Sequence, residues 1–272
     1  MVSAYQNIFV AYRVISQRPL KFFTEHKNMF DNYDYHRGGG CYEYEYEEDS
    51  DSGESEPESE DENHEISGPY RADDYQNLFN LLSHSKSSSE ADQLAFATSA
   101  SLMLHYLKIN NYFGFNSSRE SDRELNDTES YIGRLLYHMM EVTMYNSQDI
   151  LEAVAWNLEK GVTTATIGSS VCSSLALFNH SCCPNIAKTN VGATHLYITT
   201  EDIKKGQEIK NYYQVQFHDK IISTRQPFLK DHYKFSCRFY PIGDINQSLF
   251  IKNMSLCLDV RRVIRSGQCS SL

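Results

Sequence analysis

NHSCCPN, residues 179–185, gathers one imidazole, two thiols, two carboxamides and a proline into seven positions. Asparagine and serine favour turns, and Pro184 forbids the continuation of a regular helix. A structural turn is therefore the simplest interpretation of this stretch. Three functional interpretations stand beside it: a metal site, a nucleophilic thiol, and a loop that holds a ligand.

The metal and nucleophile interpretations each need residues from elsewhere in the chain. Zinc needs four Cys or His ligands in tetrahedral reach, and adjacent cysteines such as Cys182 and Cys183 rarely bind one ion together. Cys237 is the plausible further donor, and the sequence contains no C-x-x-C. A thiol nucleophile needs a histidine base and an orienting carboxamide. The side chains of Asn179 and His180 are adjacent, and adjacent side chains seldom point at one another.

The net charge of −11 belongs to one tract of the 272-residue chain. Between Cys41 and Glu65 there are thirteen acidic residues and no Lys or Arg, which leaves 25 basic against 23 acidic residues elsewhere. The remainder therefore lacks the basic footprint of a nucleic-acid binder, and we expect no direct nucleic-acid partner.

Two further features bear on the compartment. No stretch approaches the roughly 20 apolar residues of a membrane span, and the N-terminal residues lack the basic start of a signal peptide. Seven scattered cysteines, an odd number, do not form a disulfide framework. We therefore expect no membrane association and a reducing compartment, cytoplasmic or nuclear.

Apolar side chains at helical spacing predict a helical first half. The opening helix covers residues 3–16 and ends before Pro19. Further helices are predicted over 74–82 with Asp73 as cap, over 90–112, over 131–145, and over 149–160, which Gly161 ends. The methionines at positions 139, 140 and 144 are expected in the helix core rather than at a metal or thioether site.

Two polar stretches interrupt the predicted helices. Residues 38–66 are too acidic and too poor in apolar side chains to offset the entropy of ordering, so we expect a disordered acidic insertion. It could bind a partner, as a phosphorylated docking segment, through the serines at positions 50, 52, 55 and 59, or be a solvated insertion. The second stretch, 116–129, is predicted to be a loop.

Beyond Gly161 the β-branched and aromatic residues concentrate. Short strands are predicted over 162–167, 185–191, 194–200 and 208–213, separated by glycine-containing turns. A helical first half followed by a small β-rich core indicates an α+β fold rather than alternating βαβ units.

Two further motifs follow NHSCCPN in order: KKGQEIKNYY (204–213) and RQPFLKDHYKFSC (225–237). With them the sequence resembles the SET domain of the SET-and-MYND (SMYD-type) family of protein lysine methyltransferases. That family's hallmarks are NHSCxPN, a GEE(I/L) turn leading to a tyrosine, and a closing YxFxCxC segment. The preceding helical segments look like the helical insert of the same family, closest to the member with an N-terminal tetratricopeptide region.

The resemblance implies methyl transfer from S-adenosylmethionine to the ε-amine of a lysine in a protein substrate. Tyr213 matches the phenol that aligns the amine, with Tyr212 as the alternative, and Tyr233 matches a tyrosine that borders the target-lysine channel. A positioned phenol and a mostly dry channel would favour the neutral amine that the reaction needs.

The resemblance also implies a cofactor pocket. Asn179 and His180 match the pair that lines it, Tyr213 borders it, and Phe235 matches the aromatic residue that packs against the adenine ring. Stacking suits a purine because it needs no exact hydrogen bonding. Under this interpretation NHSCCPN is a ligand-binding loop.

The zinc ligands of the family are kept only in part. Family members join the cysteine of NHSC to a Cys-x-Cys-x-x-Cys segment on a structural zinc. The positions that match this segment are Cys237, Phe239 and Ile242, so Cys182 and Cys237 remain of the four ligands. Two cysteines further along, at 257 and 269, are candidate substitutes. We expect a degenerate zinc site.

The family pattern is also incomplete at the other end. The first SET strands, with a glycine-rich turn, and the MYND finger precede the helical insert in the family, and neither is recognisable before Ala11. In the GEE turn Gln207 replaces the first glutamate, while Glu208 keeps the second.

Two functions follow from this pattern. The first is protein lysine methyltransferase activity with S-adenosylmethionine; the alternative is a catalytically inactive or truncated SET-like module that binds proteins. The predicted organisation is a helical segment (1–37), the acidic insertion (38–66), a helical insert region (67–161), the C-terminal part of a SET domain (162–237) and a degenerate post-SET tail (238–272).

Overall fold

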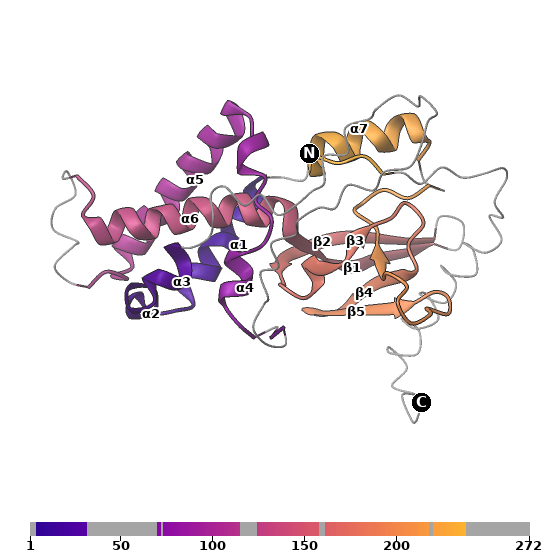
Figure 1. The fold of residues 1–272 in the computed structure, drawn as a ribbon, viewed down its shortest axis with the longest axis horizontal. Coiled ribbons are helices and arrows are strands. Elements are labelled where there is room, and N and C mark those ends of the chain that lie inside the picture. The colour runs from indigo at the N-terminus through magenta and orange to yellow at the C-terminus, as the bar shows by residue number, and fades with distance from the viewer. Residues whose placement is uncertain are drawn as a thin grey trace, which may run out of the picture.

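A computed structural model describes residues 4–31, 70–71, 73–114, 124–157, 161–217 and 220–237. Helices gather in one part of the molecule and strands in the other, with the last helix over the strands (Figure 1). The α+β prediction, with a helical first half and a small β part, is confirmed.

The helices follow the sequence pattern closely where both a cap and an apolar face are present. Ser89 and Asp92 form a capping box at the start of α5, and Asn126 and Glu129 form one at the start of α6. The helices are α1 (Ala4–Ser16), α2 (Leu20–Glu25), α3 (Lys27–Asp31), α4 (Gln76–Phe79), α5 (Glu90–Ile109), α6 (Asp127–Asn146) and α7 (Ile222–Tyr233).

The main hydrophobic core lies between α1, α5 and α6, with α4 packed against α6. Met139 and Met140 are buried in it and Met144 packs against it, so the predicted helix-core role of the three methionines is confirmed. Aromatic side chains fill the end near α2 and α3, where the rings of Phe30 and Phe79 lie 4.7 Å apart. His138 Nε2 lies 2.7 Å from the Phe79 carbonyl oxygen and so ties α6 to α4.

Among the described residues the strands form three pairs rather than one continuous sheet. Antiparallel pairing joins β1 (Ser147–Asn157) to β2 (Gly161–Val171) and β4 (Ile186–Val191) to β5 (Thr194–Thr199). The short strands β3 (Asn179–His180) and β6 (Lys210–Asn211) pair in parallel. Gly192 has a φ of 54°, a left-handed conformation that glycine adopts without steric cost, and it makes the tight turn between β4 and β5.

The helix predicted over 149–160 is wrong, because residues 149–157 lie in strand β1. Its Glu, Ala and Leu content favours a helix locally, but pairing with the β-branched strand β2 prevails. The β part consequently begins at Ser147, directly after α6, and not at residue 162.

The helix predicted over 74–82 is shorter than expected, and Asp73 does not cap it. Asp73 pairs instead with Arg71. The backbone N–H of Gln76 donates to Asp74 Oδ1 at 3.0 Å, so the neighbouring aspartate supports the start of α4. The short strand β6 similarly covers only part of the predicted 208–213.

Some predictions fall outside the described residues. These are the acidic insertion, most of the 116–129 loop, and the whole post-SET tail with the cysteines at 257 and 269. Within the part that is described, no helix is both long and apolar enough to span a bilayer.

The core predicts a clear contrast between two substitutions. Met139→Ala removes a side chain with no exposed surface on α6, and we expect the free energy of unfolding to fall by about 2–5 kcal/mol. Leu102→Ala on α5, where the side chain is 48% exposed, should change it by less than about 0.5 kcal/mol. Urea denaturation followed by circular dichroism measures both, and equal losses would contradict this core.

Candidate functional site

The NHSCCPN loop lies directly beside the segment that carries Tyr213. Strand β3 pairs with β6 so that Asn179 faces Lys210 and His180 faces Asn211. The pairing continues one step further, because the Ser181 N–H donates to the Asn211 carbonyl oxygen at 2.7 Å. Two motifs about 30 residues apart in the sequence are thereby held in a fixed register.

Asn185, the last residue of the motif, fastens the loop to the turn before β6. Its Nδ2 donates to the Glu208 carbonyl oxygen at 2.9 Å, and its Oδ1 accepts from the Lys210 N–H at 2.8 Å. The side chain is only 5% exposed, so these bonds satisfy an otherwise costly buried amide. Sequence reasoning gave Asn185 no role, although an amide that ends a turn motif is a common backbone partner.

His180 has its tautomer set by the backbone. Its Nδ1 accepts a hydrogen bond from the Tyr213 N–H at 2.9 Å. An accepting Nδ1 has no proton, so the neutral ring carries its proton on Nε2. That nitrogen lies 3.2 Å from Cys182 Sγ, to which it donates.

Four of the predicted site residues form one cluster of rings. The centroid of Tyr213 lies 5.3 Å from that of His180, 5.0 Å from that of Tyr233 and 6.0 Å from that of Phe235. The rings of His180 and Phe235 are 5.5 Å apart. Side chains from β3, from the segment just after β6, and from the end of α7 and the residues that follow it therefore converge on one place.

The end of α7 directs two of these rings. Lys234 follows Tyr233 with a φ of 64°, a left-handed turn that ends the helix. The chain then reverses, so Tyr233 and Phe235 both reach the cluster. Burial, with the nearby Tyr213 and Asp149, raises the pKa of Tyr233, which keeps this phenol neutral at physiological pH.

The hydroxyl of Tyr213 is held by the loop before the motif. It donates to the Phe178 carbonyl oxygen at 2.7 Å. With its proton engaged there, the phenol oxygen keeps lone pairs that can accept from another group. A fixed phenol of this kind can orient an amine.

Asn179 lies beside the ring cluster but faces another way. It precedes His180 on β3, and successive side chains on a strand point to opposite sides. Its Nδ2 donates to Glu208 Oε1 at 2.8 Å in an exposed hydrogen bond. This bond is the main cause that lowers the pKa of Glu208, and the hydrogen bond from Lys210 is the second. The structure thus brings Asn179 next to Glu208 rather than into contact with the rings.

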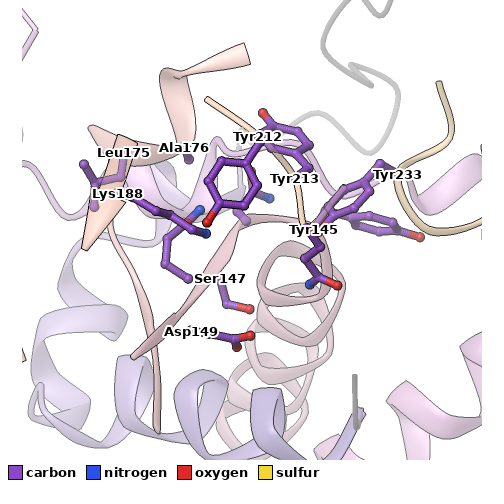
Figure 2. Close-up of a pocket in the computed structure, with 12 residues that line it drawn as sticks. Tyr145, Ser147, Asp149, Leu175, Ala176, Lys188, Tyr212, Tyr213 and Tyr233 are labelled. Atoms are coloured by element: carbon purple, nitrogen blue, oxygen red, sulfur yellow. The ribbon is translucent and has the colours of Figure 1, made fainter. Parts of the chain in front are cut away.

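A small pocket of about 40 Å³ opens beside Tyr213 (Figure 2). It lies where the end of α6, the start of β1, strand β4 and the end of α7 meet. Its lining includes Tyr145, Asp149, Lys188, Tyr212, Tyr213 and Tyr233. Sequence reasoning missed Tyr145, Asp149 and Lys188. For Asp149, the helix assigned to 149–160 hid the fact that β1 starts at the pocket.

The zinc ligands do not assemble among the described residues. Cys182, Cys237 and His180 bring their ligand atoms within 4.8 Å of one another. However, Nε2 of His180 carries the proton that the Tyr213 N–H bond forces onto it, so it has no free lone pair for a metal. Two thiols remain, whereas a closed tetrahedral zinc site needs four ligands. The described part of the chain therefore does not fit a structural zinc.

The two thiols are instead embedded in protein contacts. The carbonyl oxygen of Cys237 accepts a hydrogen bond from Gln226 Nε2, and the backbone N–H of Cys237 donates to Gln226 Oε1. Contact with Cys237, together with burial, raises the pKa of the Cys182 thiol, while the buried guanidinium of Arg225 acts in the opposite direction. Arg225 also donates from Nε to the Lys220 carbonyl oxygen at 2.9 Å. A neutral Cys182 is a poor nucleophile, which argues against thiol catalysis.

The two asparagines of the motif predict different effects on stability. Asn185→Ala leaves the Lys210 N–H and the Glu208 carbonyl without their partner, so the free energy of unfolding should fall by roughly 1–3 kcal/mol. Asn179→Ala removes one exposed bond and should cost less than about 1 kcal/mol. Chemical denaturation of both variants tests this, and a loss for Asn179→Ala as large as that for Asn185→Ala would refute the fastening role of Asn185.

The SET domain family model matches residues 25–214. Over 182 residues the chain is 26% identical to the protein-lysine N-methyltransferase SMYD4 of Mus musculus. This match covers 64% of this chain and 22% of that protein. Over 73 residues it is 37% identical to the N-lysine methyltransferase SMYD2-B of Xenopus laevis and 36% identical to the N-lysine methyltransferase SMYD2 of Homo sapiens. Each SMYD2 match covers 26% of this chain and 16% of that relative.

The matched region spans less than a quarter of the length of these relatives. The family model nevertheless covers more than half of this chain and includes the NHSCCPN loop, β6 and Tyr213. These elements position two of the four rings of the cluster, His180 and Tyr213, while Tyr233 and Phe235 lie beyond the match. The chain therefore belongs to the SET-domain family, and its similarity is to the SMYD-type members.

Proposed function

We propose that this protein transfers a methyl group from S-adenosylmethionine to the ε-amine of a lysine in a protein substrate. The observation that carries the proposal is the convergence of His180, Tyr213, Tyr233 and Phe235, with the Tyr213 hydroxyl fixed on the Phe178 carbonyl. Family membership supports the same conclusion, because the curated relatives are described as lysine methyltransferases.

The residues present fit such a cofactor at two points. The half-buried ring of Phe235, beside His180, offers an apolar face suited to a purine. The exposed amide of Asn179, oriented by Glu208 on the other side of β3, offers a polar group there. We propose that Asn179, His180, Tyr213 and Phe235 hold the cofactor, whose sulfonium supplies the methyl group.

The chain's own groups would prepare the amine. A lysine ammonium cannot attack, so the pocket must favour the neutral form. The tyrosines around the pocket, with the pKa of Tyr233 raised, add no anionic charge that would stabilise an ammonium, so that Asp149 is the acidic group in the lining. The fixed oxygen of Tyr213 can then accept a hydrogen bond from the amine and aim its lone pair.

Cofactor binding provides the first test. Isothermal titration with S-adenosylmethionine, and with its demethylated product, should show binding to the folded protein. Asn179→Ala should weaken it about tenfold, the loss of roughly 1.4 kcal/mol expected for one hydrogen bond. Asn110→Ala, at the exposed end of α5, is the matched control and should bind as the unmodified protein does. No binding to well-folded protein would refute the proposal.

The second test separates binding from chemistry. Tyr213→Phe keeps the ring in the cluster but removes the hydroxyl that Phe178 fixes, so we expect methyl transfer to a lysine-peptide library to fall roughly a hundredfold. The affinity of Tyr213→Phe for the cofactor should stay within about threefold of that of the unmodified protein, because the ring contacts remain. Tyr106→Phe on the exposed side of α5 is the control. Full activity of Tyr213→Phe would remove this phenol from the mechanism and leave Tyr212 as the alternative.

A non-catalytic, protein-binding role is the second candidate. It is favoured by the incomplete set of zinc ligands among the described residues. Under that alternative the folded protein would bind no cofactor, and Tyr213→Phe would leave the recovery of its partners unchanged. The titration above distinguishes the two candidates.

A further inference from the structure

A lysine of this chain lies inside the tyrosine-lined pocket. Lys188 is on strand β4, and its side chain lines the pocket together with Tyr212, Tyr213 and Tyr233 (Figure 2). Its Nζ lies 5.2 Å from the centre of the Tyr212 ring and donates to Gln148 Oε1 at 3.4 Å. An aromatic face and an amide oxygen thus surround the amine.

The size of the pocket matters for what else can enter. A volume of about 40 Å³ holds a few water molecules, since one water needs roughly 10–15 Å³ on this measure. Lys188 therefore already takes part of the space that the pocket offers to a lysine side chain.

Lys188 also differs chemically from lysines on the surface. Burial lowers its pKa, and Asp149, the charged group that opposes this effect, acts more weakly. The neutral, nucleophilic amine is thus more populated at Lys188 than at a lysine with the ordinary pKa.

We propose that Lys188 is methylated by the site in which it lies, so that this protein modifies itself. The proposal rests on the proposed function. The lone pair of Nζ forms the new N–C bond while the S–C bond of the sulfonium breaks. The sulfur keeps that electron pair and becomes a neutral thioether, and the extra proton on nitrogen passes to water. Lys188 and Tyr213 belong to one chain and one pocket, so the reaction is intramolecular.

The test uses the full chain, purified and incubated with S-adenosylmethionine that carries an isotope-labelled methyl group, followed by peptide mass spectrometry. We expect label at Lys188, with a labelled fraction at a given time that does not change over a tenfold range of protein concentration. Lys188→Arg keeps the positive charge but removes the acceptor, and it should abolish the label. Lys205→Arg is the matched control and should leave it unchanged.

Three outcomes separate this inference from the proposed function. If cofactor binds and a lysine-peptide library is methylated while Lys188 stays unlabelled, the self-methylation is wrong and the proposed function stands. Equal labelling of Lys188 and of exposed lysines would show non-specific transfer and would also overturn it. If the titration finds no cofactor binding and no lysine is labelled, both proposals fall together.

Discussion

The hydrogen bond from the Tyr213 backbone N–H to His180 Nδ1 is the interaction on which the site depends. It joins two motifs that are distant in sequence, and it does so with a directional bond rather than by packing alone. Because this hydrogen bond occupies Nδ1, the imidazole proton is on Nε2, which contacts Cys182 Sγ. The histidine ring then lies beside that of Phe235. One backbone donor thus determines a tautomer, a thiol contact and a ring arrangement.

This bond can form only because β3 and β6 lie in register. Asn185 provides that register from the far end of the loop, with one amide that bonds both to Lys210 and to Glu208. The residues of the NHSCCPN motif therefore have different roles. The first asparagine is exposed and bonds Glu208, the histidine contacts the rings, and the last asparagine is buried and structural.

Much of the fold was predictable because its signals are local. Apolar spacing and capping boxes identify α5 and α6, and a glycine turn between β-branched runs identifies β4 and β5. The residues of the ring cluster were also found in advance, but only through ordered motifs, since no local pattern shows that Tyr233 and His180 meet. What places them together is non-local: a parallel pairing and a left-handed residue at the end of a helix.

The wrong and missed predictions also concern features that depend on non-local contacts. Strand β1 carries residues with helical preference and becomes a strand only through its partner β2, so its local composition was misleading. Lys188 and Asp149 were missed for the related reason that a pocket wall is a property of neighbouring strands and helices. Neither residue stands out within its own segment.

The hairpin formed by β1 and β2 carries one further implication. Ser147, which lines the pocket, pairs with Val171, so the hairpin begins and ends at the same place beside the pocket. Residues added or removed far from this base would lengthen or shorten the arm without moving Asp149 or the loop that leads to His180. Evolution could therefore reshape this arm, and whatever it touches, while the chemistry at its root stayed intact.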